Sequence, residues 1–152
     1  MLMLTGCRKN EIVTLRWRDV DLEAMELNLA DTKTGARTVS LSPEAVRVLA
    51  GIPREDGNPW VIQGRKPGER LCFIDHQWCL VRERAKLEDV RLHDCRHAFA
   101  SRALALGESL PAIGRLLGHA HVETTAKYAL LARDSMHEAA ARVADSIAAD
   151  IL

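Results

Sequence analysis

The sequence predicts an α+β domain that is mainly helical and carries a small antiparallel β-sheet. Two different periodicities of the hydrophobic residues predict this fold class. Apolar and polar residues alternate over 25–29 and again over 38–41, which is typical of half-buried strands. In most of the remaining chain apolar residues recur every three or four positions, which is typical of amphipathic helices. With 152 residues, 47% of them hydrophobic, we expect one domain over residues 1–152.

The first half of the chain alternates between short helices, strands and loops. Residues 1–17 predict two helical pieces separated at Gly6, because glycine readily takes the left-handed conformation that ends a helix. The segment DTKTGA joins the two strands as a hairpin, with Lys33 near its tip. Ser42 and Pro43 predict the start of a helix over 42–52. A long loop with a short strand at 60–62 is expected next.

The second half is predicted to be helical. After a helical stripe over 74–85, the pattern predicts helices over 93–106 and 111–117, then one that starts near His121 and carries Tyr128. The final helix, over 134–148, is amphipathic. It can cover the core of its own molecule or dock on a neighbour.

Bulk composition excludes several classes of function. There are 21 basic and 21 acidic residues, so the net charge gives no general attraction to nucleic acid, and any DNA-binding surface must arise from where the basic residues lie. The four cysteines show no CxxC spacing, which argues against a zinc finger. No apolar run approaches the roughly 20 residues of a membrane span. We expect a cytoplasmic protein that needs no metal and no cofactor.

Two arginines occupy informative places. Arg8 and Glu11 lie three residues apart, so a carboxylate can orient the guanidinium on one helix face. Arg96 falls on the apolar stripe of its helix, and His93 projects beside it from the first turn. Burying an arginine is costly unless an anion pairs with it, and a helix start already favours anions. A bound phosphate is therefore a natural partner.

These residues, taken together, suit chemistry on a phosphodiester. A tyrosine hydroxyl can attack phosphorus and keep the energy of the broken bond in a phosphotyrosyl link. The paired N–H donors of an arginine guanidinium can stabilise the negative charge on the non-bridging oxygens. A lysine can protonate the leaving oxygen, and a histidine can take the phenolic proton or polarise the phosphate. The candidate catalytic residues are Arg8, Lys33, His93, Arg96, His119 and Tyr128, with Glu11 in support.

Four stretches carry a family resemblance: TGCRKNEIVTLRW, DTKTGARTVSL, LHDCRHAFAS and LLGHAHVETTAKY. In order and spacing they resemble the signature boxes of the tyrosine recombinases, also called the phage integrase family. The resemblance implies the catalytic-domain fold of enzymes that break and rejoin DNA. It further implies the roles of six residues: Arg8 and Arg96 as the two catalytic arginines, Lys33 as general acid, His93 and His119 as the two box histidines, and Tyr128 as nucleophile.

The resemblance also implies a mechanism and partners. The tyrosine attacks double-stranded DNA without a metal, leaving a 3′-phosphotyrosyl link and a free 5′-hydroxyl that attacks a partner duplex. Strand exchange in this family runs through a tetramer on DNA, which would give the helix over 134–148 a neighbour to dock on. Members usually carry an N-terminal helical DNA-clamping domain, which this sequence lacks. We therefore expect an N-terminally truncated catalytic domain with weaker DNA binding.

Alternative interpretations stay open at this point. The chain could be an inactive module that binds DNA or pairs with full-length recombinases. HDCRH places His93 and His97 four residues apart around an acid, which resembles a zinc-hydrolase helix, although Asp94 stands where glutamate is usual. A type IB topoisomerase shares the chemistry but resembles the four stretches less. His97 is more simply explained as a packing or capping residue.

Overall fold

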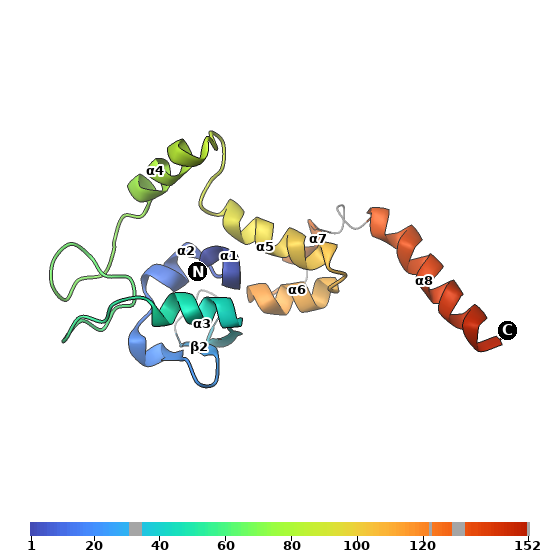
Figure 1. Ribbon diagram of the computed structural model, residues 1–152, viewed down its shortest axis with the longest axis horizontal. Helices are drawn as coiled ribbons and strands as arrows, with labels where there is room; N and C mark the ends of the chain where they lie inside the picture. The colour runs from blue at the N-terminus through green and yellow to red at the C-terminus, as the bar shows by residue number, and fades with distance from the viewer. Residues whose placement is uncertain (31–34, 122, 129–132, 152) are drawn as a thin grey trace.

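Helices make up most of the computed structural model, and a small sheet lies at one edge of it (Figure 1). The structure describes the whole chain except residues 31–34, 122, 129–132 and 152. In chain order the elements are α1 (Leu2–Thr5), α2 (Lys9–Val13), a 3₁₀ turn (Trp17–Asp19), β1 (Val20–Asp21), β2 (Glu26–Leu29), β3 (Arg37–Ser40), α3 (Pro43–Ala50), α4 (Asp75–Ala85), α5 (Asp94–Ala105), α6 (Leu110–Leu117), α7 (Glu123–Ala126) and α8 (Arg133–Ile151). The predicted α+β class is confirmed.

Within the described residues the sheet is antiparallel, in the order β1-β2-β3. Leu27 of β2 pairs with Val39 of β3, and both are buried. The alternation therefore predicted the inner face of these two strands correctly. The additional strand β1 was not expected, since two residues are too few to show a period. Residues 60–62 form only a single bridge, between Trp60 and Arg16, where a short strand was predicted.

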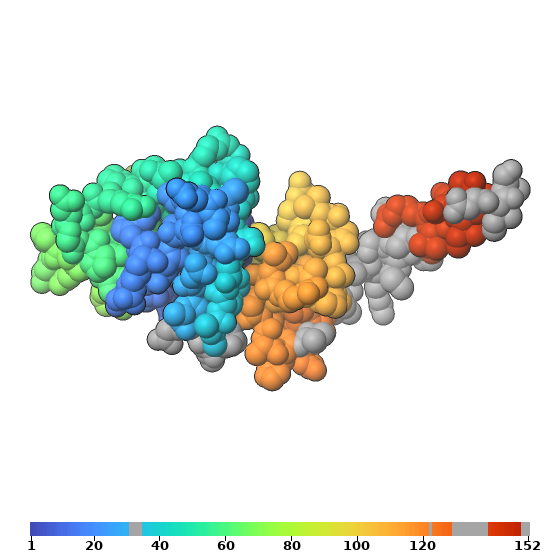
Figure 2. Space-filling model, turned by 90° about the horizontal axis from the view of Figure 1, so that it is seen from below, coloured from blue at the N-terminus to red at the C-terminus, as the bar shows by residue number. Residues whose placement is uncertain are grey.

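The core consists of two clusters. The first lies between the sheet, α2 and α3, and includes Leu15, Leu27 and Leu49. The second lies between α5 and α6 and includes Ile113 and Leu117. Helix α1 packs against α5 and joins the two parts, which lie directly against each other in Figure 2. The candidate active site is built where these two parts meet.

Helix boundaries follow their capping residues. Ser42 and Ser109 each accept a hydrogen bond from the backbone N–H three residues on, and a proline stands within the first two positions of both α3 and α6. Gly6 and Gly118 end α1 and α6 in the left-handed conformation, with φ of 62° and 65°. The predicted helix starts are confirmed within one or two residues.

Three predictions need correction or lie outside the described residues. Tyr128 does not belong to a helix: α7 ends at Ala126, and the Tyr128 N–H closes a turn onto the Thr125 carbonyl. None of the described residues of α4 is buried, so its apolar stripe is not a core face, and Val81 is 51% exposed. Lys33 lies outside the described residues.

Helix α8 extends away from the remainder of the molecule (Figure 1). Its residues Val143 and Ile147, four apart on one face, are 61% and 53% exposed.

Among the helices that the structure describes, none is both long enough and apolar enough to cross a bilayer.

Candidate active site

The C-terminal end of α6 holds three guanidinium groups together. The last carbonyls of a helix have no partner within it, and the helix dipole is negative at this end, so cations are favoured there. Three consecutive carbonyls accept one arginine each: Leu116 O from Arg37 Nη1 at 3.1 Å, Leu117 O from Arg96 Nη2 at 2.7 Å, and Gly118 O from Arg8 Nη2 at 3.1 Å. Arginines from the start of α2, from β3 and from α5 therefore converge, although Arg8 lies 110 residues from the carbonyl that it binds.

Glu11 binds two of these arginines. Its Oε1 accepts from Arg8 Nη1 at 2.9 Å, and its Oε2 accepts from the Arg8 backbone N–H at 2.6 Å and from Arg37 Nη2 at 3.0 Å. Burial by itself raises the pKa of this carboxyl, but the hydrogen bonds from Arg8 and Arg37 outweigh burial and hold the pKa below its ordinary value. Glu11 is therefore ionised and orients the Arg8 fork.

Arg96 is held in a different way. Its residue is only 4% exposed, and its two described hydrogen bonds go to neutral carbonyls, Gly6 O and Leu117 O, each at 2.7 Å. Burial, and then the neighbouring charge of Arg8, lower the pKa of its guanidinium to about 10. It remains charged at neutral pH, and carbonyl dipoles compensate a full charge incompletely. This group therefore has a strong remaining affinity for an anion.

The three histidines of the site differ in exposure and partner. His93 is the exposed residue before α5, and its ring meets the edge of the His97 ring, with centroids 4.9 Å apart. The Nδ1 of His119 lies 2.8 Å from the Thr125 hydroxyl. Burial, with the charges of Arg96 and Arg8, lowers the pKa of His119 to about 4. His119 is therefore neutral at physiological pH.

Tyr128 belongs to the second core cluster, and its hydroxyl is directed toward His97. Its residue is 4% exposed and packs with the apolar residues of α5 and α6. The phenolic Oη lies 2.7 Å from His97 Nδ1. The Nζ of Lys127 lies 5.1 Å from the centre of the Tyr128 ring. Burial raises the pKa of the phenol, so that it is neutral at rest.

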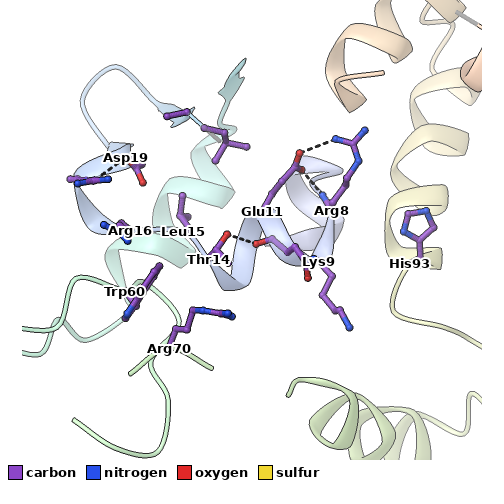
Figure 3. Close-up of a pocket in the computed structure, with 14 residues that line it drawn as sticks. Arg8, Lys9, Glu11, Thr14, Leu15, Arg16, Asp19, Trp60, Arg70 and His93 are labelled. Carbon is purple, nitrogen blue, oxygen red and sulfur yellow. Dashed lines mark hydrogen bonds and ion pairs between the residues drawn. The ribbon is translucent and has the colours of Figure 1, made fainter. Parts of the chain in front are cut away.

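An open cleft of about 830 Å³ lies in front of α2, with Arg8 and His93 at one end and Trp60 at the other (Figure 3). Its lining includes five basic side chains and two acidic ones: Arg8, Lys9, Arg16, Arg18, Arg70, Glu11 and Asp19. A chain with zero net charge therefore concentrates positive charge on one surface.

The structure brings together most of the predicted site. Arg8, Arg96 and His119 meet at the end of α6, and His93 and Tyr128 meet through His97. Sequence reasoning missed two residues. Arg37 shares the inward face of β3 with Val39, a signal that the strand alternation already contained. His97 was predicted only as a packing or capping residue, or as a zinc ligand in the alternative interpretation.

A metal site is not apparent. Among the residues that the structure describes, no group of three or more histidine, cysteine, aspartate or glutamate side chains could hold a metal ion. His93 and His97 are in contact through their rings, with an interplanar angle of 90°.

Comparison with known proteins identifies the family. The family model described as the phage integrase family matches residues 1–134. The chain belongs to the phage integrase family. It is 31% identical over 126 residues to prophage integrase IntF of Escherichia coli K12, covering 78% of this chain and 27% of that protein. It is 32% identical over 130 residues to tyrosine recombinase XerC of Xanthomonas axonopodis pv. citri, covering 82% of this chain and 42% of that protein.

Solved structures of the phage integrase family share the fold. The crystal structure of XerA recombinase matches with a TM-score of 0.73 and 26% identity, covering 93% of this chain and 55% of that one. The catalytic domain of bacteriophage HP1 integrase matches with a TM-score of 0.67 and 25% identity, covering 91% of this chain and 76% of that one. The chain thus has the tyrosine recombinase catalytic-domain fold. It spans less than half the length of the curated relatives IntF and XerC.

Proposed function

We propose that this chain cleaves and rejoins double-stranded DNA through a 3′-phosphotyrosyl intermediate on Tyr128. The observation that carries the proposal is the set of guanidinium groups at the end of α6, beside a tyrosine bonded to a histidine. Arg8 and Arg96 bind the non-bridging oxygens of the scissile phosphate and stabilise the charge that develops there. Buried, preoriented donors are worth more than flexible ones because they need no reorganisation during the reaction.

The remaining residues have separate roles in this proposal. Glu11 orients Arg8 through two hydrogen bonds. His93 and His119 donate hydrogen bonds to the phosphate. Partial desolvation and the charge of Arg96 lower the pKa of each, so that the neutral form predominates near pH 7. Lys33 protonates the leaving 5′-oxygen. No step requires a metal, since the cations already supply the positive charge.

DNA reaches the site along the basic cleft of Figure 3. The five basic residues of its lining can contact successive backbone phosphates, which is the sequence-independent part of DNA binding. The structure of the Tn1549 transposon integrase in complex with circular intermediate DNA supports this proposal for the partner. It matches with a TM-score of 0.66 and 20% identity, covering 84% of this chain and 52% of that one.

Strand exchange needs more than one active site. We infer a tetramer on DNA in which α8 docks on a neighbouring chain, because the exposed Val143 and Ile147 provide an apolar stripe that the described part of this molecule leaves uncovered. Sedimentation of the protein–DNA complex counts the chains. A stoichiometry of four supports the tetramer, and a single chain per duplex contradicts it.

Covalent capture tests the cleavage chemistry without knowledge of the target site. The protein is incubated with a pool of random-sequence duplexes, each carrying a nick that lets the cleaved fragment escape, and protein-linked DNA is recovered after denaturation. We expect an adduct with the wild-type chain, with or without EDTA, and none with Tyr128→Phe.

Each other outcome contradicts part of the proposal. An adduct that persists in Tyr128→Phe assigns the nucleophile elsewhere, and loss of the adduct with EDTA indicates metal chemistry. DNA binding without any adduct identifies a binding module in place of an enzyme.

A further inference from the structure

The hydroxyl of Tyr128 contacts a histidine that lies outside the set of predicted catalytic residues. Its described partner is His97 Nδ1, at 2.7 Å. We propose that His97 is a further catalytic residue, which takes the phenolic proton when Tyr128 attacks phosphorus and returns it when the strand is rejoined. This inference rests on the proposed function of Tyr128 and names the base that the reaction needs.

The geometry favours His97 over the other two histidines. The Nδ1 of His119 is already bonded to the Thr125 hydroxyl at 2.8 Å. His93 lines the cleft and reaches Tyr128 only through the His97 ring, which it meets edge-on. His97 therefore lies between the nucleophile and the residue that borders the cleft.

The surroundings of His97 keep it able to accept a proton. Burial, and then the charges of Lys127 and His93, lower its pKa, whereas Asp94 acts in the opposite direction and Arg91 in the same one. A neutral imidazole with its proton on Nε2 offers the Nδ1 lone pair to the phenol. Burial raises the pKa of Tyr128, so that the phenol does not ionise unaided at neutral pH. A nucleophile whose pKa lies well above the working pH is usually activated by a base that is hydrogen-bonded to it.

The step balances in atoms and charge. As the bond from Tyr128 Oη to phosphorus forms and the bond from phosphorus to O5′ breaks, the phenolic proton moves to His97 Nδ1. The leaving 5′-oxygen takes a proton from the general acid, which we propose to be Lys33. Rejoining reverses both transfers, and the neighbouring Lys127 disfavours the imidazolium, which helps the proton return to the phenol.

A set of matched variants separates proton transfer from simple positioning. His97→Asn places an amide near the position of Nδ1 and can still hydrogen-bond the phenol, but it cannot take a proton. His97→Ala leaves space for added imidazole. His76→Ala removes an exposed histidine on α4 and is the control. Rates of adduct formation are measured on a nicked duplex recovered by the covalent capture, with and without imidazole.

We expect His97→Asn and His97→Ala to slow adduct formation by about 10²- to 10⁴-fold, the usual contribution of general base catalysis. Imidazole should restore part of the rate to His97→Ala and change neither His97→Asn nor His76→Ala. A wild-type rate that falls with acid pH should lose that limb in both His97 variants. A duplex with sulfur in place of the leaving 5′-oxygen needs no general acid, so it should leave the His97 defect unchanged.

Two results would overturn the inference and leave the proposed function intact. One is a Tyr128-dependent adduct that forms in His97→Asn at a rate within about twofold of wild type, which makes the contact one of positioning. The other is a faster rate in His97→Ala, which shows that the contact holds the tyrosine back. An adduct that persists in Tyr128→Phe would instead remove the proposed function itself.

Discussion

Two regions of the molecule hold positive charge in opposite ways. In the first, around α2 and β3, a buried carboxylate pairs with its cations, since Glu11 binds both Arg8 and Arg37. In the second, around α5, α6 and Tyr128, Arg96 is bonded to carbonyls and His119 to a hydroxyl. In the first region one carboxylate faces two guanidinium groups, and its ion pairs serve as a frame that fixes the orientation of Arg8. In the second, the described partners of Arg96 are neutral carbonyls, which leaves its charge less compensated and its affinity for an anion greater.

Replacing each catalytic arginine by methionine should give the largest effects. We expect Arg8→Met and Arg96→Met each to slow adduct formation by about 10²-fold or more, because each removes a preoriented donor to the phosphate. The two variants should differ in their free energy of unfolding. Arg96→Met leaves two buried carbonyls without their donor and should lower the free energy of unfolding by about 1–3 kcal/mol.

For Arg8→Met we expect a smaller loss of stability, because the Arg8 side chain is 26% exposed and Glu11 keeps its bond to Arg37. Urea unfolding and single-turnover adduct formation measure the two quantities. Equal losses of stability in the two variants would contradict the difference between the regions.

A smaller effect is expected at the glycine that joins them. A Cβ at residue 118 would lie 2.6 Å from Arg37 Cδ, and the backbone there has φ of +65°. Gly107→Ala is the matched control, since it also has a positive φ, of +89°, but nothing within 4 Å of the added atom. We expect Gly118→Ala to be less stable than Gly107→Ala by about 1–3 kcal/mol in urea unfolding, the cost of overpacking.

The same pair tests whether Arg37 supports the site. Displacing Arg37 disturbs Glu11 and therefore Arg8, so Gly118→Ala should also lower the rate of adduct formation, whereas Gly107→Ala should not. Equal stability and equal rates in the two variants would show that Arg37 moves aside without consequence.

A last effect concerns the pH dependence of the ion pairs that Glu11 forms. The pKa of Glu11 is below its ordinary value, so its carboxylate stabilises the folded protein above about pH 4.5, and this contribution is lost as the pH falls toward the folded pKa. We expect Glu11→Gln to cost about 2 kcal/mol at pH 7. The difference from wild type in urea unfolding should shrink below pH 4.5. A difference that stays constant with pH would mean that the lost bonds do not depend on the charge.

The sequence predicted the fold class, the main elements and most of the residues at the end of α6. Hydrophobic period and capping residues act locally, so they predicted the starts of α3 and α6 through Ser42 and Ser109. Strand alternation could also have placed Arg37 on the inner face of β3, next to Val39. The apolar residues of the pattern do not by themselves identify a charged residue on that face.

Contacts between distant segments could not be predicted in this way. The bond from His97 to Tyr128 spans 31 residues, and no period or spacing links the two positions. The same holds for the three carbonyls of α6, since a helix end attracts cations in general but does not specify which ones. The sequence predicts a helix through Tyr128, whereas α7 ends at Ala126 and the Tyr128 side chain packs in the second core cluster.

Peptide mapping of the covalent complex tests the central claim most directly. The captured adduct is digested with protease and nuclease, and the modified peptide is sequenced by mass spectrometry. Since Tyr128 is the only tyrosine of the chain, the assignment is unambiguous. We predict one nucleotide attached through a 3′-phosphate to Tyr128. A nucleotide on any other residue, or one attached through a 5′-phosphate, would contradict the account.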